Sequence, residues 1–183
     1  MNLTEKQLKE NYVFKGKIIN VRQDTALLPN GATALREVIE HPGGVCVAAL
    51  DGDDNLLFVK QFRYPYMEEV LEIPAGKRDR GRNEDPLECG KRELLEETGA
   101  TADTFLPLGE LYPTPGYCGE IIWMYFAKDL KFSTQHLDED EFLDVCRIPL
   151  EKAVEMVLSG EIKDAKTQAA VLKVKLLRDK GVI

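Results

Sequence analysis

The N-terminal part of the chain alternates short apolar runs with turn residues. Residues 12–19 (YVFKGKII) and 32–39 (ATALREVI) suit strands, and Pro29, Asn30 and Gly31 form a strong turn signal between them. The pattern predicts a small antiparallel unit of two or three strands. A unit of this size has too little core to stand alone, so we expect it to dock on the rest of the chain or on a partner subunit.

A break at residues 41–44 (HPGG) separates this unit from a longer pattern of mixed elements. Apolar runs between turn signals predict strands, and helical periodicity with start and stop residues predicts three helices. The strands are expected at 45–50, 56–62, 70–73, 105–112, 120–127 and 142–148, and the helices at 85–99, 150–158 and 165–178. Helices on both sides of a mixed central sheet make an α/β/α layered domain. The expected division is residues 1–41 as an N-terminal β subdomain and 42–183 as the main domain.

The helix predicted at residues 85–99 (DPLECGKRELLEETG) has residues typical of a helix cap at both ends. Asp85 suits the N-cap, Pro86 the first helical position, and Glu88 the third, which together predict a capping box. Gly99 suits the position just after the last turn, where a left-handed backbone ends many helices.

Three carboxylates on this well-capped helix contradict its own electrostatics. Glu93 is three and four positions from Glu96 and Glu97, so the three side chains share one face and repel. Glu96 and Glu97 also lie in the last turn, where the helix dipole disfavours anions. Arg92 can offset part of this through Glu88 or Glu96. On the helix alone, two interpretations stay open: a solvated acidic face, or a site for a hard divalent cation.

Composition narrows the classes of function. The chain has 183 residues and a net charge of -8, which disfavours non-specific nucleic-acid binding. No window approaches the roughly 20 apolar residues of a membrane-spanning helix, and the polar start does not suggest a signal peptide. The four scattered cysteines form no CxxC pair and lie far from both histidines, so a zinc site is not expected. Such cysteines are typical of reduced thiols, hence of the cytoplasm.

A longer pattern includes these carboxylates. Gly76, Glu84 and residues 92–100 (RELLEETGA) resemble the box of the Nudix hydrolase family, Gx5Ex7REUxEExGU, with U a bulky aliphatic residue. Seven residues separate Glu84 from Arg92, as the motif requires. Two departures are visible: seven residues rather than five separate Gly76 from Glu84, and the small Ala100 takes the last U position. Because extra residues in a loop cost little, we interpret the first departure as a longer loop rather than a lost site.

Further segments resemble the ADP-ribose pyrophosphatase branch of that family. They are residues 35–38 (LREV), 61–63 (QFR), 72–76 (EIPAG), 114–116 (TPG) and 137–141 (LDEDE). The resemblance spans about residues 12–178 and implies a Nudix fold, an α/β/α sandwich with a mixed central sheet and a small N-terminal antiparallel sheet. It also implies a homodimer in which that sheet is exchanged and completes the partner's substrate pocket.

The chemistry implied by the resemblance is hydrolysis of ADP-ribose to AMP and ribose 5-phosphate with Mg²⁺, or with Mn²⁺ in its place. The implied metal ligands are oxygens of Glu93, Glu96, Glu97 and Glu141 and the backbone carbonyl of Ala75. Arg92 is expected to orient these carboxylates, with a plain helix salt bridge as the alternative, and Glu84 has the same two alternatives, of which orientation is favoured. Glu139 is implied as the general base, among four consecutive acids at 138–141. A solvated acidic loop is the alternative for that segment.

The substrate contacts are implied in the same way. Arg36 and Arg63 are candidate diphosphate clamps, because guanidinium groups bind phosphate oxygens bidentately. Pro115 and Gly116 are expected to shape the wall for the ribose. Four cations, Lys77, Arg78, Arg80 and Arg82, either attract an anionic substrate or keep a loop soluble, and the second is favoured.

Three other functions compete with this interpretation. The same chemistry on another nucleoside diphosphate sugar is the nearest, since the box reads neither base nor sugar. A Nudix-fold module that binds a nucleotide without cleaving it is the second, and it is disfavoured because Glu93, Glu96 and Glu97 are all retained. A structural acidic protein, which would bind no nucleotide, is the third.

Overall fold

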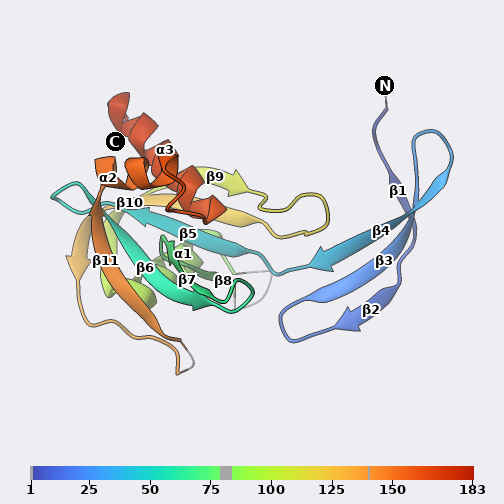
Figure 1. The fold of residues 1–183 in the computed structure, drawn as a ribbon, viewed down its shortest axis with the longest axis horizontal. Helices are drawn as coiled ribbons and strands as arrows, with labels where there is room; N and C mark the ends of the chain where they lie inside the picture. The colour runs from blue at the N-terminus through green and yellow to red at the C-terminus, as the bar shows by residue number, and fades with distance from the viewer. Residues whose placement is uncertain (1, 79–83, 140) are drawn as a thin grey trace. The chain divides into compact units, whose positions relative to one another are not determined.

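The structure is a computed structural model that describes residues 2–78, 84–139 and 141–183. The chain divides into two compact units (Figure 1). Unit 1 comprises Met1–Gly43 and Tyr112–Ile121, and unit 2 comprises Gly44–Leu111 and Ile122–Ile183. A segment of the central chain, 112–121, therefore belongs with the N-terminal unit.

Unit 1 is an antiparallel sheet built around one long strand, β3. Its strands are β1 (Lys6–Lys9), β2 (Tyr12–Lys15), β3 (Asn20–Leu27) and β4 (Thr33–Glu40). β3 pairs with β4 on one side, and on the other side with β1 near its end and β2 near its start. The predicted turn is present: Leu28 N–H donates to the carbonyl of Ala32, and Gly31 has a φ of 85°.

The prediction of a single strand over residues 12–19 is wrong. β2 ends at Lys15, and the chain turns where Gly16 N–H donates to the carbonyl of Ile19. A short strand, β1, precedes it and was not predicted, because its four residues (KQLK) have little apolar character. All residues of β1 and β2 are exposed. Unit 1 thus has almost no core of its own, as its size indicated.

Unit 2 contains two sheets. The mixed one has the order β8 (Ala75–Lys77), β5 (Gly44–Ala49), β10 (Ile122–Phe132), β9 (Ala100–Leu111), with β5 and β10 parallel. The second is antiparallel, with the order β11 (Leu143–Pro149), β6 (Asn55–Arg63), β7 (Glu68–Glu72). β8 lies outside the predicted strands, because proline and glycine, here Pro74 and Gly76, are typical of the end of a strand rather than of its interior.

Among the described residues of unit 2, three helices cover its sheets: α1 (Pro86–Thr98), α2 (Leu150–Leu158) and α3 (Ala165–Asp179) (Figure 1). Alternate residues of β5 point to opposite faces. Cys46 and Ala48 pack in the cluster that includes α2 and α3, whereas Val47 and Ala49 pack with Leu94 of α1. The two apolar layers confirm the predicted α/β/α arrangement.

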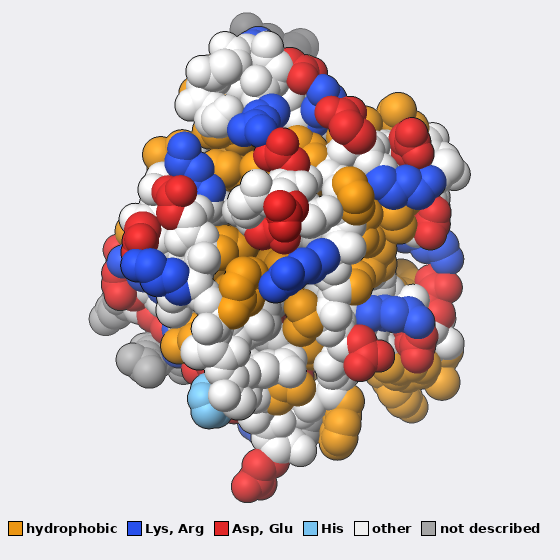
Figure 2. Space-filling view, turned by 90° about the vertical axis from the view of Figure 1, so that its left-hand side faces the viewer, with side chains coloured by type: hydrophobic (Ala, Val, Ile, Leu, Met, Phe, Trp, Pro, Cys, Tyr) orange, Lys and Arg blue, Asp and Glu red, His pale blue; other side chains and the backbone are white. Residues whose placement is uncertain are grey.

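The surface carries both signs of charge. On the face shown in Figure 2, acidic and basic side chains are interspersed rather than gathered by sign. In the described part of the chain, the longest helix has 15 residues, and no helix has the length and apolar character needed to cross a membrane.

Candidate active site

Helix α1 begins and ends where the sequence predicted. The Asp85 carboxylate accepts hydrogen bonds from the backbone N–H groups of Leu87 and Glu88 at 2.9 and 3.1 Å. The predicted reciprocal contact of the capping box is replaced, because the Glu88 side chain instead pairs with Lys91 at 2.7 Å. Gly99 ends the helix with a φ of 68°, and a Cβ there would lie 2.4 Å from the carbonyl of Ser133.

Two of the box carboxylates are buried rather than solvated. Glu93 is 7% exposed and Glu97 is 2% exposed. The Ala75 backbone N–H donates to Oε2 of Glu97 at 2.8 Å, which ties the helix to β8. A Cβ at Gly76 would lie 2.0 Å from the carboxyl carbon of Glu93, so any other residue there would force that carboxylate to move. The alternative of a freely solvated acidic face is therefore wrong for these two glutamates.

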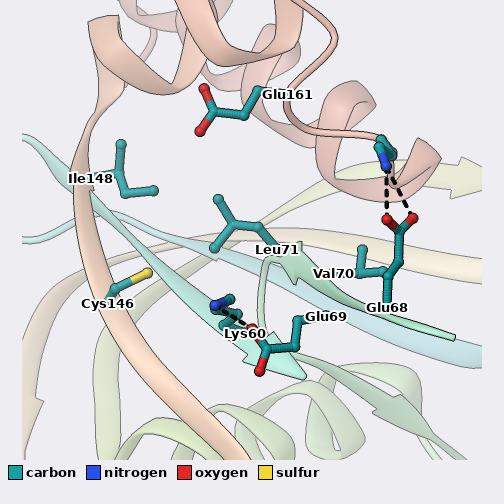
Figure 3. Close-up of a pocket in the computed structure, with 9 residues that line it drawn as sticks. Lys60, Glu68, Glu69, Val70, Leu71, Cys146, Ile148 and Glu161 are labelled. Atoms are coloured by element: carbon teal, nitrogen blue, oxygen red, sulfur yellow. Dashed lines mark hydrogen bonds and ion pairs between the residues drawn. The ribbon is translucent and has the colours of Figure 1, made fainter. Parts of the chain in front are cut away.

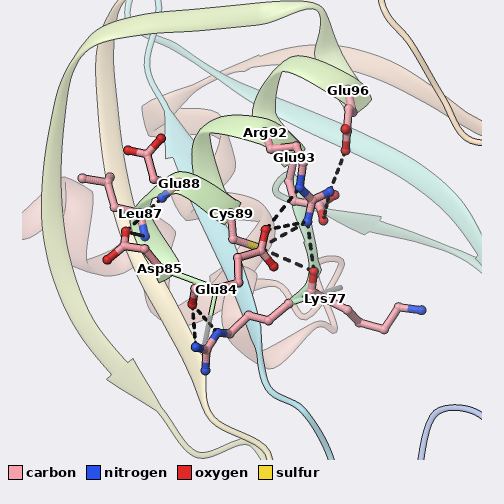
Figure 4. A network of polar contacts seen from close by, with 10 residues as sticks. Lys77, Glu84, Asp85, Leu87, Glu88, Cys89, Arg92, Glu93 and Glu96 are labelled. Carbon is pink, nitrogen blue, oxygen red and sulfur yellow. Dashed lines mark hydrogen bonds and ion pairs between the residues drawn. The ribbon is translucent and has the colours of Figure 1, made fainter. Parts of the chain in front are cut away.

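Arg92 is the hub of a polar network on α1 (Figure 4). Its Nη1 contacts Glu93 at 2.9 Å and Glu96 at 2.8 Å. Its Nη2 lies 3.4 Å from Oε1 of Glu84 and donates to the carbonyl of Lys77 at 3.2 Å. Burial lowers the pKa of Arg92, but the charge of Glu93 and the hydrogen bond to Glu96 raise it further, so the guanidinium stays charged. The sequence predicted the contact with Glu96, whereas the contact expected with Glu88 is replaced by those with Glu84 and Glu93.

Like charges meet at the C-terminal end of α1. Burial raises the pKa of Glu97 well above its ordinary value, and the charges of Glu141 and Glu93 add to the rise. Burial and the charge of Asp138 raise the pKa of Glu141 as well, with a contribution from Glu96. The acidic segment predicted to join the box glutamates thus lies close enough to couple with them.

The polypeptide after β10 brings that segment to the helix. Its backbone follows the end of α1, where Ser133 N–H donates to the carbonyl of Gly99 at 2.7 Å and His136 N–H donates to that of Glu96 at 3.0 Å. Further on, Glu141 N–H donates to the carbonyl of Asp138 at 3.0 Å. Glu139, the candidate base, is exposed. Asp140 lies outside the described residues.

The arginines have partners that the sequence did not reveal. Arg63 donates through Nε and Nη2 to the two carboxylate oxygens of Glu72, at 2.5 and 2.8 Å. The guanidinium of Arg78 lies over the Trp123 ring, 4.7 Å from its centre, and donates to the carbonyl of Glu84 at 2.5 Å through Nη2. Arg78 thus contacts Glu84 and Trp123, a role that neither substrate attraction nor simple solubility anticipated. Arg80 and Arg82 lie outside the described residues.

The remaining candidates belong to unit 1. Arg36 on β4 makes a two-point pair with Glu5, at 2.9 and 2.6 Å. Pro115 and Gly116 lie in a turn closed by Cys118 N–H, which donates to the carbonyl of Thr114 at 3.0 Å. Nothing lies within 4 Å of a Cβ placed on Gly116.

The donor set fits a hard divalent cation by its chemistry. Glu97 and Glu141 are carboxylates whose pKa values rise because burial and like charge disfavour their ionised forms, and a cation would reverse that. Within residues 2–78, 84–139 and 141–183, no three acidic, histidine or cysteine side chains are already arranged around one point.

A pocket of about 370 Å³ also opens elsewhere in unit 2, between β6, β7 and β11 (Figure 3). The residues that line it include none of the box carboxylates. Its two lysines are engaged, Lys60 with Glu69 and Lys163 with Glu68. The chemistry of this pocket therefore gives no reason to place the active site there.

Comparison with known proteins defines the class. The family model for the NUDIX domain matches residues 32–171, and that for the nucleoside diphosphate sugar hydrolase N-terminal domain matches residues 5–39. The chain belongs to the Nudix hydrolase family.

Individual relatives extend over almost the whole chain. It is 40% identical to an ADP-ribose pyrophosphatase of Bacillus subtilis, over 93% of this chain and 92% of the relative. It is 39% identical to a methanol dehydrogenase activator of Bacillus methanolicus, over 91% and 90% of the two chains. A crystal structure of an ADP compounds hydrolase has the same fold, with a TM-score of 0.85, 23% identity and full coverage of both chains.

Proposed function

We propose that this Nudix hydrolase cleaves the pyrophosphate bond of ADP-ribose, giving AMP and ribose 5-phosphate, with a divalent metal ion. The observation that carries the proposal is the burial of Glu93 and Glu97 on one face of α1, with Glu97 held by the backbone N–H of Ala75 and within electrostatic range of Glu141. Such a cluster is unfavourable unless a cation or a catalytic role compensates for it. The similarity to ADP-ribose pyrophosphatases supports the choice of substrate.

The residues have separate tasks in this reaction. Glu93, Glu96, Glu97 and Glu141, with the carbonyl of Ala75, would hold Mg²⁺ or Mn²⁺. When bound, the ion would neutralise charge on the diphosphate and acidify a water molecule. Arg92 holds Glu93 and Glu96 through direct ion pairs and so fixes their orientation. We assign the general base to Glu139, whose exposed carboxylate can accept a proton from water.

Substrate contacts follow the same assignment. Arg36 and Arg63 are the proposed diphosphate clamps, and Pro115 with Gly116 the proposed wall for the ribose. Their present partners, Glu5 for Arg36 and Glu72 for Arg63, orient the two guanidinium groups. We expect Arg36 to exchange its exposed partner for phosphate more readily than Arg63, whose partner is 3% exposed.

Other nucleoside diphosphate sugars are the second candidate substrates. Relatives 33–35% identical to this chain are GDP-mannose pyrophosphatases, and the matched N-terminal domain is named for nucleoside diphosphate sugars in general. Relatives with similar sequence identity to this chain are thus named for different substrates, so sequence identity alone does not identify the sugar. A non-catalytic nucleotide-binding module remains the third possibility to test.

Product analysis decides between these candidates. The purified protein is incubated with ADP-ribose, ADP-glucose, UDP-glucose or GDP-mannose and Mg²⁺, with and without a chelator, and the products are separated by chromatography. We expect AMP and ribose 5-phosphate from ADP-ribose, fastest among the four and abolished by the chelator. Faster turnover of another nucleoside diphosphate sugar would make that compound the assigned substrate. Binding without products would indicate the non-catalytic module.

Two glutamine variants test the assigned residues. Glu97→Gln should nearly abolish turnover with the fold intact, whereas Glu88→Gln, on the same helix but paired only at the surface with Lys91, should leave turnover unchanged. Full activity of the first variant would refute the metal assignment. Glu139→Gln should lower turnover strongly while metal binding is retained. If turnover falls in Asp138 or Glu141 variants but not in Glu139→Gln, the general base is one of those residues instead of Glu139.

We also propose a homodimer that exchanges the N-terminal sheets. Large apolar side chains of unit 1 lie exposed on its strands and need a cover: Leu8, Tyr12, Val13, Phe14 and Leu35. A monomeric mass in light scattering would contradict the dimer. The cytoplasm stays the predicted compartment, on the basis of the four scattered cysteines of the sequence.

A further inference from the structure

A hydrogen bond connects the first turn of α3 to the segment that leads into β8. Asp164 caps this helix, and its carboxylate accepts from the N–H and the hydroxyl of Thr167 at 2.9 and 2.6 Å. The Thr167 hydroxyl oxygen in turn accepts from the N–H of Ile73 at 2.9 Å. Ile73 lies two residues before Ala75, whose N–H holds Glu97. A turn 94 residues away in sequence is therefore built into the support of the site.

Lys166, in the same turn, is a buried cation with a specific partner. Only 9% of the residue is exposed, and its ammonium group pairs with Oε2 of Glu72 and lies 3.1 Å from Asp164. Burial lowers the pKa of Lys166, but the charges of Asp164 and Glu72 raise it further, so the group stays protonated. A buried lysine is tolerated only with such partners.

Glu72 connects this lysine to the candidate clamp. Oε2 of Glu72 is shared between Lys166 and Nη2 of Arg63, while Oε1 accepts from Nε of Arg63. The Arg63 side chain is 38% exposed and reaches solvent, whereas the Glu72 carboxylate that holds it is buried. Burial raises the pKa values of Glu97 and Glu141, and the nearby charge of Arg63 opposes both shifts. Arg63 is thus within electrostatic range of the proposed catalytic carboxylates.

We propose that Lys166 is a positioning residue for the pyrophosphatase reaction, holding Glu72 so that Glu72 presents the guanidinium of Arg63 to the diphosphate. The proposal rests on the function proposed above. Lys166 and Arg63 share the buried carboxylate of Glu72. Its negative charge is therefore divided between them and does not fully cancel the positive charge of Arg63. Without the ammonium group, Glu72 is left with Arg63 as its cation, which draws Arg63 inward and weakens the positive charge available to the substrate.

The expected effect is on binding more than on the chemical step. A clamp that holds the diphosphate equally in the ground state and the transition state contributes to KM and little to kcat. We therefore expect Lys166→Met to raise KM for ADP-ribose about 10-fold and to lower kcat by less than about 3-fold. Lys166→Arg, which keeps the charge, should recover most of the affinity.

A double-mutant cycle separates positioning from general stability. Steady-state kinetics with ADP-ribose and Mg²⁺ are measured for wild type, Lys166→Met, Arg63→Gln and the double variant. If Lys166 acts through Arg63, the lysine change adds no further rise in KM once Arg63 is absent. Lys163→Met is the matched control, since that lysine is three residues away but pairs with Glu68 at the surface. Its KM should equal that of wild type.

Folding is checked by circular dichroism and thermal melting, and Lys166→Gln serves if the methionine variant does not fold. An unchanged KM in folded variants, or fully additive effects in the cycle, would overturn the proposal. Failure of both variants to fold would assign Lys166 to folding alone and overturn it too. If wild type itself releases no products from ADP-ribose, the proposed function has failed instead, which is a distinguishable result.

Discussion

Replacing Glu72 by glutamine tests the buried ion cluster that supports the candidate site. Glu72 is 3% exposed and contacts both Lys166 and Arg63. Breaking a buried pair by removing one partner costs about 3–5 kcal/mol. The lower end applies here, because Arg63 is 38% exposed and water can solvate it, while glutamine keeps one oxygen as an acceptor. We expect a loss of about 3 kcal/mol, which lowers Tm by roughly 6–12 °C in a chain of this length.

The pH dependence of this loss identifies its cause. Although burial raises the pKa of Glu72, the hydrogen bond from Arg63 and the charge of Lys166 lower it more, so the folded-state pKa lies below the ordinary value of 4.5. A carboxyl group with a depressed folded-state pKa contributes stability above its unfolded-state pKa, and that stability is lost as the pH falls through the folded-state value. The difference between wild type and Glu72→Gln should be complete at pH 7 and shrink below pH 4.5.

Urea unfolding at several pH values between 3 and 7 measures this difference in the free energy of unfolding. Glu69→Gln is the control, because Glu69 pairs with Lys60 at the exposed surface, and no measurable change is expected. A difference that stays constant over this pH range would show that packing, rather than charge, holds Glu72. A loss no larger than that of the control would refute the reasoning about burial.

Three further substitutions test the helix and the box. Gly76→Ala places a methyl group 2.0 Å from the Glu93 carboxyl carbon, so kcat should fall at least about 10-fold, whereas Gly52→Ala, with open space around it, should leave kcat unchanged. Arg92→Lys replaces a fork that serves several partners with a point charge, and metal affinity measured by calorimetry should fall about 10–100-fold. Asp85→Ala removes both N-cap hydrogen bonds and should cost about 1 kcal/mol in urea unfolding, with kcat retained; an unchanged stability would contradict the cap.

The parts of the fold that sequence predicted well are governed by local rules. The ends of α1 follow from Asp85 and Gly99, because caps act within one turn of the backbone, and the start of the helix predicted from residue 165 is likewise set by a local cap, Asp164. The turn at Gly31 was found for the same reason. The prediction of a strand over residues 12–19 failed because a turn interrupts a run whose composition alone suits a strand. The turn is closed by the hydrogen bond from the Gly16 N–H to the Ile19 carbonyl.

The clustering at the candidate site was only partly predictable. Periodicity places Glu93 and Glu97 on one face of α1, and that requires nothing beyond helix geometry. It does not reveal that Ala75 holds Glu97, since this contact joins residues 22 apart through a strand that was not predicted. The proximity of Glu141 to the box was expected only from the family resemblance. It depends on backbone hydrogen bonds such as that from the His136 N–H to the Glu96 carbonyl.

Lys166 and Glu72 show the limit most clearly. Read alone, a lysine in the first turn of an amphipathic helix is a surface residue, and helix dipoles even disfavour a cation there. Its burial arises because the first turn of α3 docks on the end of β7, where Glu72 is itself buried and pairs with the lysine. The unfavourable placement is compensated by Asp164, which caps the helix and contacts the lysine at 3.1 Å. A residue that breaks a local rule and has a buried partner at long range is a candidate for function, which is why the kinetic cycle on Lys166 and Arg63 is the more informative experiment.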